Sequence, residues 1–306
     1  MHKSVLLEEC LTYLNLKEDS IVVDCTLGYG GHSSEILKRI PKGFLYAFDQ
    51  DIDAIRSSEK RLREIGDNFE IIQSNFQYLK SALAKRNITK VDAILFDLGV
   101  SSPQLDEKDR GFSFHQDAPL DMRMDRSQSL TAKEVVNTYS YQDLVRIFKE
   151  YGEEKFATSI ARAIERQRKE APLETTLELA ELIKSAVPEK YRREKHPARK
   201  VFQAIRIEVN RELEVCEIAV RDALDCLDVD GRLCVITFHS LEDKIVKNLY
   251  KIHSTVKKEL MKLPVIPEEY QPKYKVVATV VPTEKELSEN KRARSAKLRV
   301  IARIKK

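Results

Sequence analysis

The sequence lacks the features of membrane and secreted proteins. No apolar run approaches the length of a membrane span. The short N-terminal apolar stretch contains Glu8 and Glu9, so it does not predict a signal peptide. Neither an internal repeat nor a low-complexity tract is present. We therefore expect a cytoplasmic protein that does not interact with membranes.

Cysteine is scarce and follows no pattern. The five cysteines are odd in number and never form a C-x-x-C pair: Cys10, Cys25, Cys216, Cys226 and Cys234. This distribution predicts free thiols in a reducing compartment and argues against a disulfide framework or a zinc site. No set of His, Cys and Asp residues has metal-ligand spacing, so we expect no metal.

What the sequence does contain suits a soluble chain with a sizeable core. The 306 residues are 42% hydrophobic and 33% charged, enough for one large domain or two. The net charge is +4, but residues 291–306 hold eight Lys or Arg and no acid. A second basic cluster comprises Arg192, Arg193, Lys195, Arg199 and Lys200. Each cluster fits either a polyanion such as nucleic acid or an ordinary solvated face.

Strands and helices alternate in the first third of the chain. The predicted strands are residues 21–25, 44–48, 69–72 and 91–96. Helical patterns lie between them at residues 33–40, 51–65 and 76–86. This alternation predicts an α/β fold, in which a parallel sheet carries helices on both faces.

The alternation stops after Asp97. A long polar loop follows, and then helical patterns without strands, one of them beginning with the capping box at Thr131–Glu134. We predict an all-helical insertion at residues 105–208. The predicted second domain is then discontinuous, with residues 1–104 and 209–306.

The α/β pattern resumes beyond the insertion. A helix near residues 211–227 leads through a turn at 228–231 into a buried strand at 232–238. Residues 274–281 and 298–304 are rich in β-branched residues. We expect these two segments to pair in an antiparallel manner at an edge of the sheet.

A glycine loop, DCTLGYGGHS from Asp24 to Ser33, joins the first strand to the first helix of the sheet. Such a turn offers free backbone N–H groups to a ligand. Ser33 stands where the dinucleotide fingerprint G-x-G-x-x-G needs its third glycine. The acid-x-G-x-G-x-G pattern of S-adenosylmethionine enzymes fits better, with Thr26 replacing its first glycine. A tight turn without any ligand is the remaining interpretation.

Further candidates follow the other strands. Asp49 can accept both ribose hydroxyls of either cofactor class. Phe76 can cover an adenine face or belong to the core. Asp97, followed by Ser101, occupies the position at which methyltransferases of exocyclic amines carry an Asp/Asn-Pro-Pro-aromatic tetrad, although the prolines and the aromatic are missing. Carboxylate, hydroxyl or carbonyl acceptors there can turn an amine lone pair toward a sulfonium methyl group.

Longer blocks are more specific. They include GGHS at residues 30–33, DLGVSSPQLD from Asp97, RGFSF from Arg110, PLDMRMD from Pro119, YGEE from Tyr151, HPA from His196, FQAIR from Phe202, NREL from Asn210, FHSLED from Phe238 and RARS from Arg292. With them the chain resembles, over essentially its whole length, the bacterial 16S ribosomal RNA cytosine-N4 methyltransferase family (RsmH/MraW-type).

The resemblance implies a Rossmann-like methyltransferase domain with an inserted helical domain. It implies that S-adenosylmethionine is bound by Gly30, Gly31, His32, Asp49, Phe76, Asp97 and Gln104. The expected reaction is N4-methylation of a decoding-centre cytidine in 16S rRNA, within the small ribosomal subunit. Asp97, Ser101 and His239 are the catalytic candidates, and none is assigned as a general base. Ser240 is expected to cap the helix that follows His239, and His239 itself could instead be a satisfied core residue.

The basic helical insertion is expected to recognise RNA, and the target cytidine must be unpaired or flipped to enter the site. The oligomeric state stays open, with a homodimer among the candidate assemblies. Two other functions are alternatives to an rRNA methyltransferase. One is a nicotinamide oxidoreductase, disfavoured by Ser33. The other is a non-catalytic ribosome-assembly factor on a methyltransferase fold, disfavoured by the intact set of acids at the strand ends.

Overall fold

The computed structural model describes residues 4–100, 104, 107–194 and 196–306. The chain forms two compact units: residues 1–99 with 213–306, and residues 100–212. The first unit is discontinuous, and the second is inserted into it. The sequence prediction had placed these boundaries after residues 104 and 208. Each unit has its own hydrophobic core.

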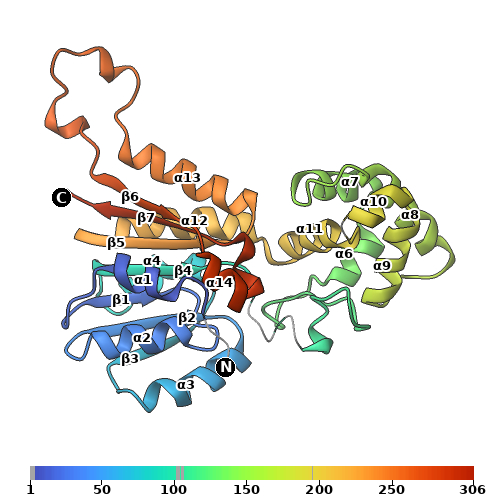
Figure 1. The fold of residues 1–306 in the computed structure, drawn as a ribbon, viewed down its shortest axis with the longest axis horizontal. Helices are drawn as coiled ribbons and strands as arrows, with labels where there is room; N and C mark the ends of the chain where they lie inside the picture. The colour runs from blue at the N-terminus through green and yellow to red at the C-terminus, as the bar shows by residue number, and fades with distance from the viewer. Residues whose placement is uncertain (1–3, 101–103, 105–106, 195) are drawn as a thin grey trace. The chain divides into compact units, whose positions relative to one another are not determined.

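A seven-stranded sheet forms the first unit: β1 (Ile21–Asp24), β2 (Phe44–Asp49), β3 (Phe69–Gln73), β4 (Val91–Asp97), β5 (Leu227–Thr237), β6 (Tyr274–Val280) and β7 (Lys297–Arg303). The sheet order is β3-β2-β1-β4-β5-β7-β6 (Figure 1). The pairs among β1 to β5 are parallel, whereas β7 is antiparallel to both β5 and β6. The predicted parallel sheet and its antiparallel edge pair are confirmed.

The predicted turn at residues 228–231 is wrong, because these residues belong to β5. The register shows how: Val91 and Ala93 of β4 pair with Leu227 and Arg232 of β5, so the extra residues of β5 form an irregularity. Asp230 lies there in the left-handed region, with φ of 66°. Turn-forming residues thus mark a bulge in the strand rather than its beginning.

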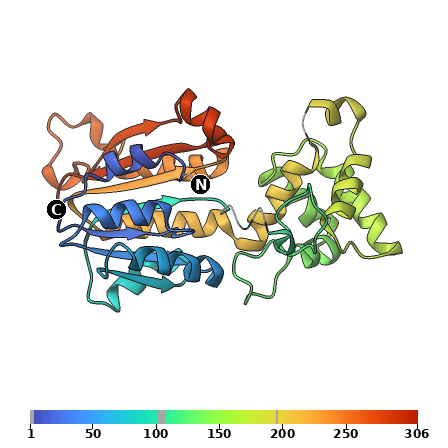
Figure 2. The same ribbon diagram turned by 60° about the horizontal axis from the view of Figure 1, so that its bottom comes forward.

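Helices cover both faces of the sheet (Figures 1 and 2). They are α1 (Leu7–Leu14), α2 (Gly31–Arg39) and α3 (Ile52–Arg63) on one face, and α4 (Leu79–Ala84), α12 (Glu212–Cys226) and α13 (Ser240–Ser254) on the other. The pleat of β2 serves both layers, since Leu45 and Ala47 enter the first core and Tyr46 and Phe48 the second. Continuous apolar strands of this kind are expected where both faces are covered.

The C-terminal part of the first unit is largely regular. Between α13 and β6 the chain makes two 3₁₀ turns, η3 (Leu260–Lys262) and η4 (Glu268–Tyr270). After β6 come α14 (Glu284–Glu289) and η5 (Lys291–Ser295). The basic stretch that ends the chain therefore includes a strand of the sheet. Its Lys297 and Arg299 both pair with Asp243 of α13, at 3.0 and 2.7 Å.

The second unit is helical, as predicted. Its helices are α6 (Ala132–Thr138), α7 (Tyr141–Glu150), α8 (Ala157–Glu170), α9 (Thr176–Ser185), α10 (Glu189–Glu194) and α11 (Ala198–Asn210). The predicted capping box of Thr131 and Glu134 is present. Thr175 and Glu178 form a second one at the start of α9, which ends before Pro188. Thus local capping sets where these helices begin.

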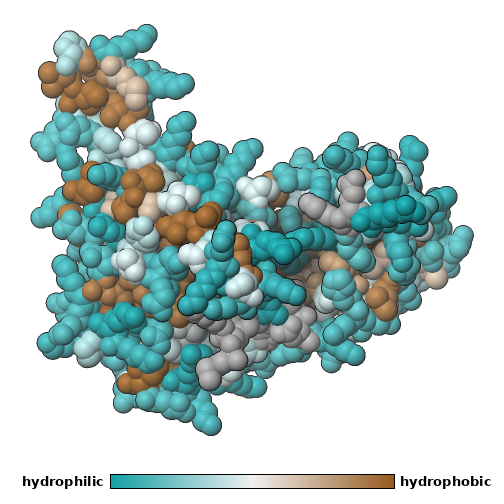
Figure 3. Space-filling model, viewed as in Figure 1, coloured by the Kyte–Doolittle hydropathy of each residue, from teal (hydrophilic) through white to brown (hydrophobic). Residues whose placement is uncertain are grey.

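All five cysteines are free and buried, in agreement with the expectation of reduced thiols. Among the residues that the structure describes, no helix is long and apolar enough to cross a membrane. The face shown in Figure 3 is mostly hydrophilic, with separate apolar patches.

Candidate active site

The glycine loop has the geometry that its sequence predicts. Gly30 caps α2 with φ of 71°, in the left-handed region that favours glycine. A Cβ on Gly31 would meet the Ser4 hydroxyl oxygen, so a side chain at this position would require Ser4 to change its rotamer. The loop leads directly into the first turn of α2, whose first N–H groups have no partner within the helix. These groups and the positive end of the helix suit an anionic or polar ligand.

Asp24, at the end of β1, stabilises this loop from within. Its side chain is 1% exposed. One carboxylate oxygen accepts from the Thr26 N–H at 3.0 Å and the other from the Ser33 hydroxyl at 2.6 Å. Thr26 in turn accepts from the Asp97 N–H at 2.7 Å, which links the loop to β4. The residue that breaks the dinucleotide fingerprint, Ser33, therefore holds Asp24 in place.

Asp49, at the end of β2, is partly exposed. Its two oxygens accept from the Gly28 and Asp51 N–H groups, each at 2.9 Å. Because each carboxylate oxygen has a second lone pair, both can still accept from a ligand hydroxyl. Burial raises the pKa of Asp49 to about 6, and the same two hydrogen bonds oppose this shift.

Asp97, at the end of β4, is the least satisfied of the three carboxylates. Its Oδ1 is buried and has no hydrogen-bond partner among the described residues, although 25% of the side chain is exposed. Burial, followed by the charges of Asp24 and Glu242, raises the pKa of Asp97 to about 8. At neutral pH the surroundings given by the protein thus favour the protonated acid, and a bound cation would favour the charged form.

The His32 side chain faces inward from the first turn of α2. It is 5% exposed, its Nε2 lies 3.2 Å from the Val5 carbonyl oxygen, and its Nδ1 lies 3.6 Å from Asp97 Oδ2. Burial lowers the pKa of His32, so the neutral ring donates from Nε2 and keeps a lone pair on Nδ1. The imidazole is committed to the protein's own packing, and its backbone N–H lies in the helix turn.

Phe76 follows β3, in the 3₁₀ turn η1 (Phe76–Tyr78). It is partly buried and packs edge-on against Phe96, with ring centroids 5.5 Å apart. It therefore contributes to the core and leaves part of its surface at the same edge of the sheet as the carboxylates. The core interpretation is therefore confirmed, whereas the contact of Phe76 with an adenine stays a prediction.

His239, rather than Ser240, is the N-cap of α13, so the predicted cap was wrong by one residue. Its Nδ1 accepts from the Glu242 N–H, and Glu242 Oε2 accepts from the Phe238 N–H at 2.8 Å. His239 Nε2 lies 3.1 Å from Glu242 Oε1, outside hydrogen-bond geometry. The histidine thus starts a helix at the end of β5, the neighbour of β4.

Gln104, another predicted site residue, belongs to the second unit and is 6% exposed. Ser101 lies outside the described residues. Arg110, at 2% exposure, donates to the Arg123 and Met124 carbonyl oxygens. It therefore orders the polar loop that follows β4.

Three side chains of the basic cluster around α10 have partners within the protein. Arg193 pairs with Glu189, Arg192 donates to the Val187 carbonyl oxygen and Lys200 to that of Glu153. Lys195 lies outside the described residues. Arg193 is nevertheless 78% exposed, so its pair with Glu189 is weak in water.

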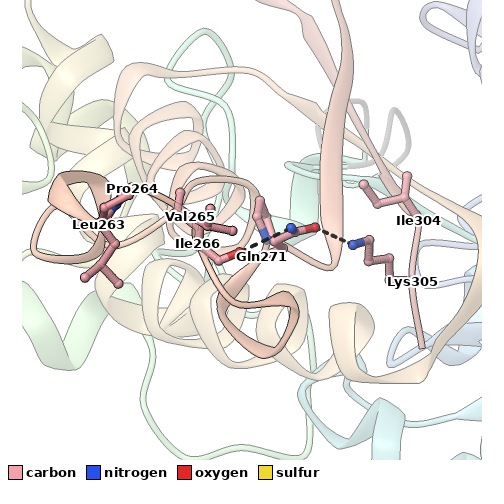
Figure 4. A pocket seen from close by; sticks show the side chains of 8 residues that line it. Leu263, Pro264, Val265, Ile266, Gln271, Ile304 and Lys305 are labelled. Carbon is pink, nitrogen blue, oxygen red and sulfur yellow. Dashed lines mark hydrogen bonds between the residues drawn. The ribbon is translucent and has the colours of Figure 1, made fainter.

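A shallow cavity lies elsewhere, near the 3₁₀ turns after α13 (Figure 4). Its apolar lining comes from residues 263–266 and Ile304. The two polar side chains in it pair with each other, since Lys305 donates to Gln271 Oε1 at 2.6 Å. Because its polar side chains already bind each other, this cavity is a weaker candidate for a catalytic site than the strand-end carboxylates.

Sequence reasoning treated Thr26 and Ser33 only as replacements for glycine and assigned no role to Glu242. Hydroxyl side chains next to a strand-end acid were the available signal for the first two. The x-x-Glu spacing after His239 was the signal for the third. All three act by holding the acids and the helix start in place.

Acids at the carboxyl ends of three neighbouring strands, beside a glycine loop, define the nucleoside-binding edge of a Rossmann-like methyltransferase fold. A model of the MraW methylase family matches residues 1–304. The chain belongs to this family and is a methyltransferase.

Two relatives show how close the similarity is. "Ribosomal RNA small subunit methyltransferase H" of Exiguobacterium sibiricum is 53% identical, with 99% of this chain and 98% of that protein covered. The protein of the same name from Lactiplantibacillus plantarum is also 53% identical, with 99% and 97% covered. A solved rRNA methylase from Streptococcus thermophilus is 13% identical, with 100% and 99% covered and a TM-score of 0.45.

Proposed function

We propose that this methyltransferase uses S-adenosylmethionine to methylate N4 of a decoding-centre cytidine in 16S rRNA, within the small ribosomal subunit. The observation that carries the proposal is the orphaned Asp97 Oδ1 beside the glycine loop. The rRNA substrate is supported by two relatives, both named "Ribosomal RNA small subunit methyltransferase H", that match 99% of this chain. The protein would act in the cytoplasm, where bacterial ribosomes assemble.

The chain's residues fit this cofactor. S-adenosylmethionine supplies an electrophilic sulfonium methyl group and a net positive charge when bound. Gly30, Gly31 and the backbone of His32 would approach it closely at the start of α2. Asp49 would accept the ribose hydroxyls and Phe76 would cover the adenine. Gln104 is a further proposed contact, and no metal enters the scheme.

The chemistry asks the protein to orient an amine whose lone pair is delocalised into the ring. An ionised Asp97 can accept a hydrogen bond from the N4–H group and so align the nitrogen lone pair with the methyl group. Ser101 and His239 are proposed to assist at the substrate. The bound cofactor would supply the methyl group that N4 receives, and N4 would lose one proton to solvent. We assign no general base for that proton.

The α10 region of the helical unit is proposed to bind rRNA phosphates. A homodimer is the proposed assembly. Charge reversal of Arg192 and Arg193 should weaken RNA binding without changing cofactor affinity. Binding to small subunits, measured over a salt series, tests this. Unchanged RNA affinity at every salt concentration would remove α10 from the interface.

The deciding experiment compares rRNA nucleosides from cells with and without the gene by mass spectrometry. Loss of N4-methylcytidine, restored by the parent gene but not by the Asp97→Asn variant, is expected. Unchanged N4-methylcytidine with defective subunits would instead favour the non-catalytic assembly factor.

A further inference from the structure

The exposed charged side chains of α13 are all lysines, and the other exposed residues of this helix are Ser240, Asn248 and Ile252. Lys244, Lys247 and Lys251 are exposed and spaced by three and four residues, so they form one stripe along the helix. The opposite face is buried, with Val246, Leu249 and Tyr250 in the core under the sheet. The stripe thus faces solvent over a length of about 10 Å, from the helical rise per residue.

The side chains of these lysines have no ion-pair or hydrogen-bond partner among the described residues, whereas Lys297 and Arg299 of the neighbouring strand β7 both pair with Asp243. The two acids of α13 are already occupied. Glu242 is 1% exposed and caps the helix start, and Asp243 is held by Lys297 and Arg299. The exposed side of α13 therefore has positive charge that nothing in the described chain neutralises.

The excess extends beyond the helix. Residues 244–275 contain eight lysines and three glutamates, a net charge of +5, against +4 for the whole chain. By contrast, α12 covers the same face of the sheet with five acids and one arginine, and Glu217 and Asp225 among these acids pair with Arg221 and Lys80. Two helices of one layer thus differ in the sign of their charge, since the exposed charged side chains of α13 are all lysines.

The lysine stripe begins near the strand ends that hold Asp97. The stripe begins one turn after His239, at the end of β5. Leu98, which follows Asp97, donates its N–H to the Ile236 carbonyl of β5 at 3.1 Å. The lysines therefore lead away from the strand ends that hold Asp97. A polyanion whose reacting base is at those strand ends would lie with further phosphates near α13.

We propose that the Lys244–Lys247–Lys251 stripe of α13 is a phosphate-binding track for the RNA substrate, separate from the helical insertion. The proposal rests on the proposed function. The track fits the backbone of single-stranded RNA because its contacts are charges without base-reading groups. It would position the strand without selecting its sequence.

The test is a triple variant, Lys244→Glu, Lys247→Glu and Lys251→Glu, with a triple Lys→Arg variant at the same positions. The matched control changes Lys17, Lys85 and Lys285 to Glu, exposed lysines in the same unit with no ion pair among the described residues. Affinity for a fluorescently labelled decoding-centre RNA is measured over a salt series. Titration with S-adenosylmethionine and thermal unfolding report the site and the fold.

The stripe variant should bind RNA at least about tenfold more weakly and lower the slope of log affinity against log salt by about 2, as expected for three phosphate contacts to a single strand. The arginine variant should restore binding, and cofactor affinity should not change. Equal weakening by the control, or parental affinity in the stripe variant, would overturn the proposal. If the parent binds this RNA but transfers no methyl group to cytidine in small ribosomal subunits, the proposed function fails while the track stands.

Discussion

The carboxyl ends of β1 and β4 place the same residue type at neighbouring positions of one sheet, with different results. Asp24 is buried and both of its oxygens accept hydrogen bonds from the glycine loop. Asp97 leaves one buried oxygen without a partner among the described residues. The comparison teaches that a strand-end acid can build the site or serve its ligand, and that hydrogen-bond satisfaction tells which.

The largest expected effect belongs to Asp97. The Asp97→Asn variant keeps the shape of the side chain but cannot be ionised, so methyl transfer should fall about 100-fold or more. Its stability at pH 8 should equal or exceed that of the parent, since a buried charge is removed. Activity on small subunits and urea unfolding measure both. A large loss of stability would place Asp97 with Asp24 as a structural acid.

Asp24→Ala should have the opposite profile. It leaves the Ser33 hydroxyl and the Thr26 N–H without their acceptor, so the free energy of unfolding should fall by about 2–3 kcal/mol. Urea denaturation gives this quantity. Ser33→Ala is the partner variant, and it should lose less because it removes one donor only. A fully stable Asp24→Ala protein would contradict the structural role of this acid.

Asp49 lies between Asp24 and Asp97 in this comparison, because both of its oxygens accept backbone hydrogen bonds and the residue is also partly exposed. Asp49→Ala should weaken S-adenosylmethionine binding about tenfold, the value of one charged hydrogen bond, without unfolding the protein. Asp67, whose side chain is 90% exposed, provides the control, since Asp67→Ala should change nothing. Calorimetric titration measures the affinity, and equal affinity in Asp49→Ala and the parent would rule out this contact.

The last prediction is a pH dependence of stability. In the folded protein without ligand the pKa of Asp97 is about 8 and that of Asp49 about 6, both above the ordinary value. The stability they contribute is therefore complete below about pH 4 and is lost as the pH rises through 6 and 8. The slope is at most about 1.4 kcal/mol per pH unit for each proton.

The same shifts predict proton release when a cation binds. S-adenosylmethionine should release protons at pH 7, measured by calorimetry in buffers that differ in ionisation enthalpy. The Asp97→Asn variant should release fewer. If stability and proton release were the same in parent and variant, Asp97 would already be ionised in the empty protein.

Much of this structure follows from local rules. Alternation of apolar runs predicted the strands from Ile21 to Asp97 and the helices between them, and the capping box at Thr131 predicted a helix start. The sequence failed where local and tertiary effects compete. The residues Asp228–Gly231 have turn chemistry, but pairing with β4 keeps them in a strand with a bulge. His239 caps α13 because Glu242 completes the box.

The sequence by itself determined the α/β class, the glycine loop, the family and the identity of the strand-end acids. These depend on backbone propensity and on short spacings, which are local in the chain. Only the tertiary structure decided which acid is satisfied, because Asp24, Ser33 and Thr26 must meet Asp97 from another strand before the difference exists. It also decided which cations are paired, since Asp243 meets Arg299 only through the packing of α13 on β7. Desolvation and hydrogen bonding act on groups distant in sequence, and for that reason they are read from the fold.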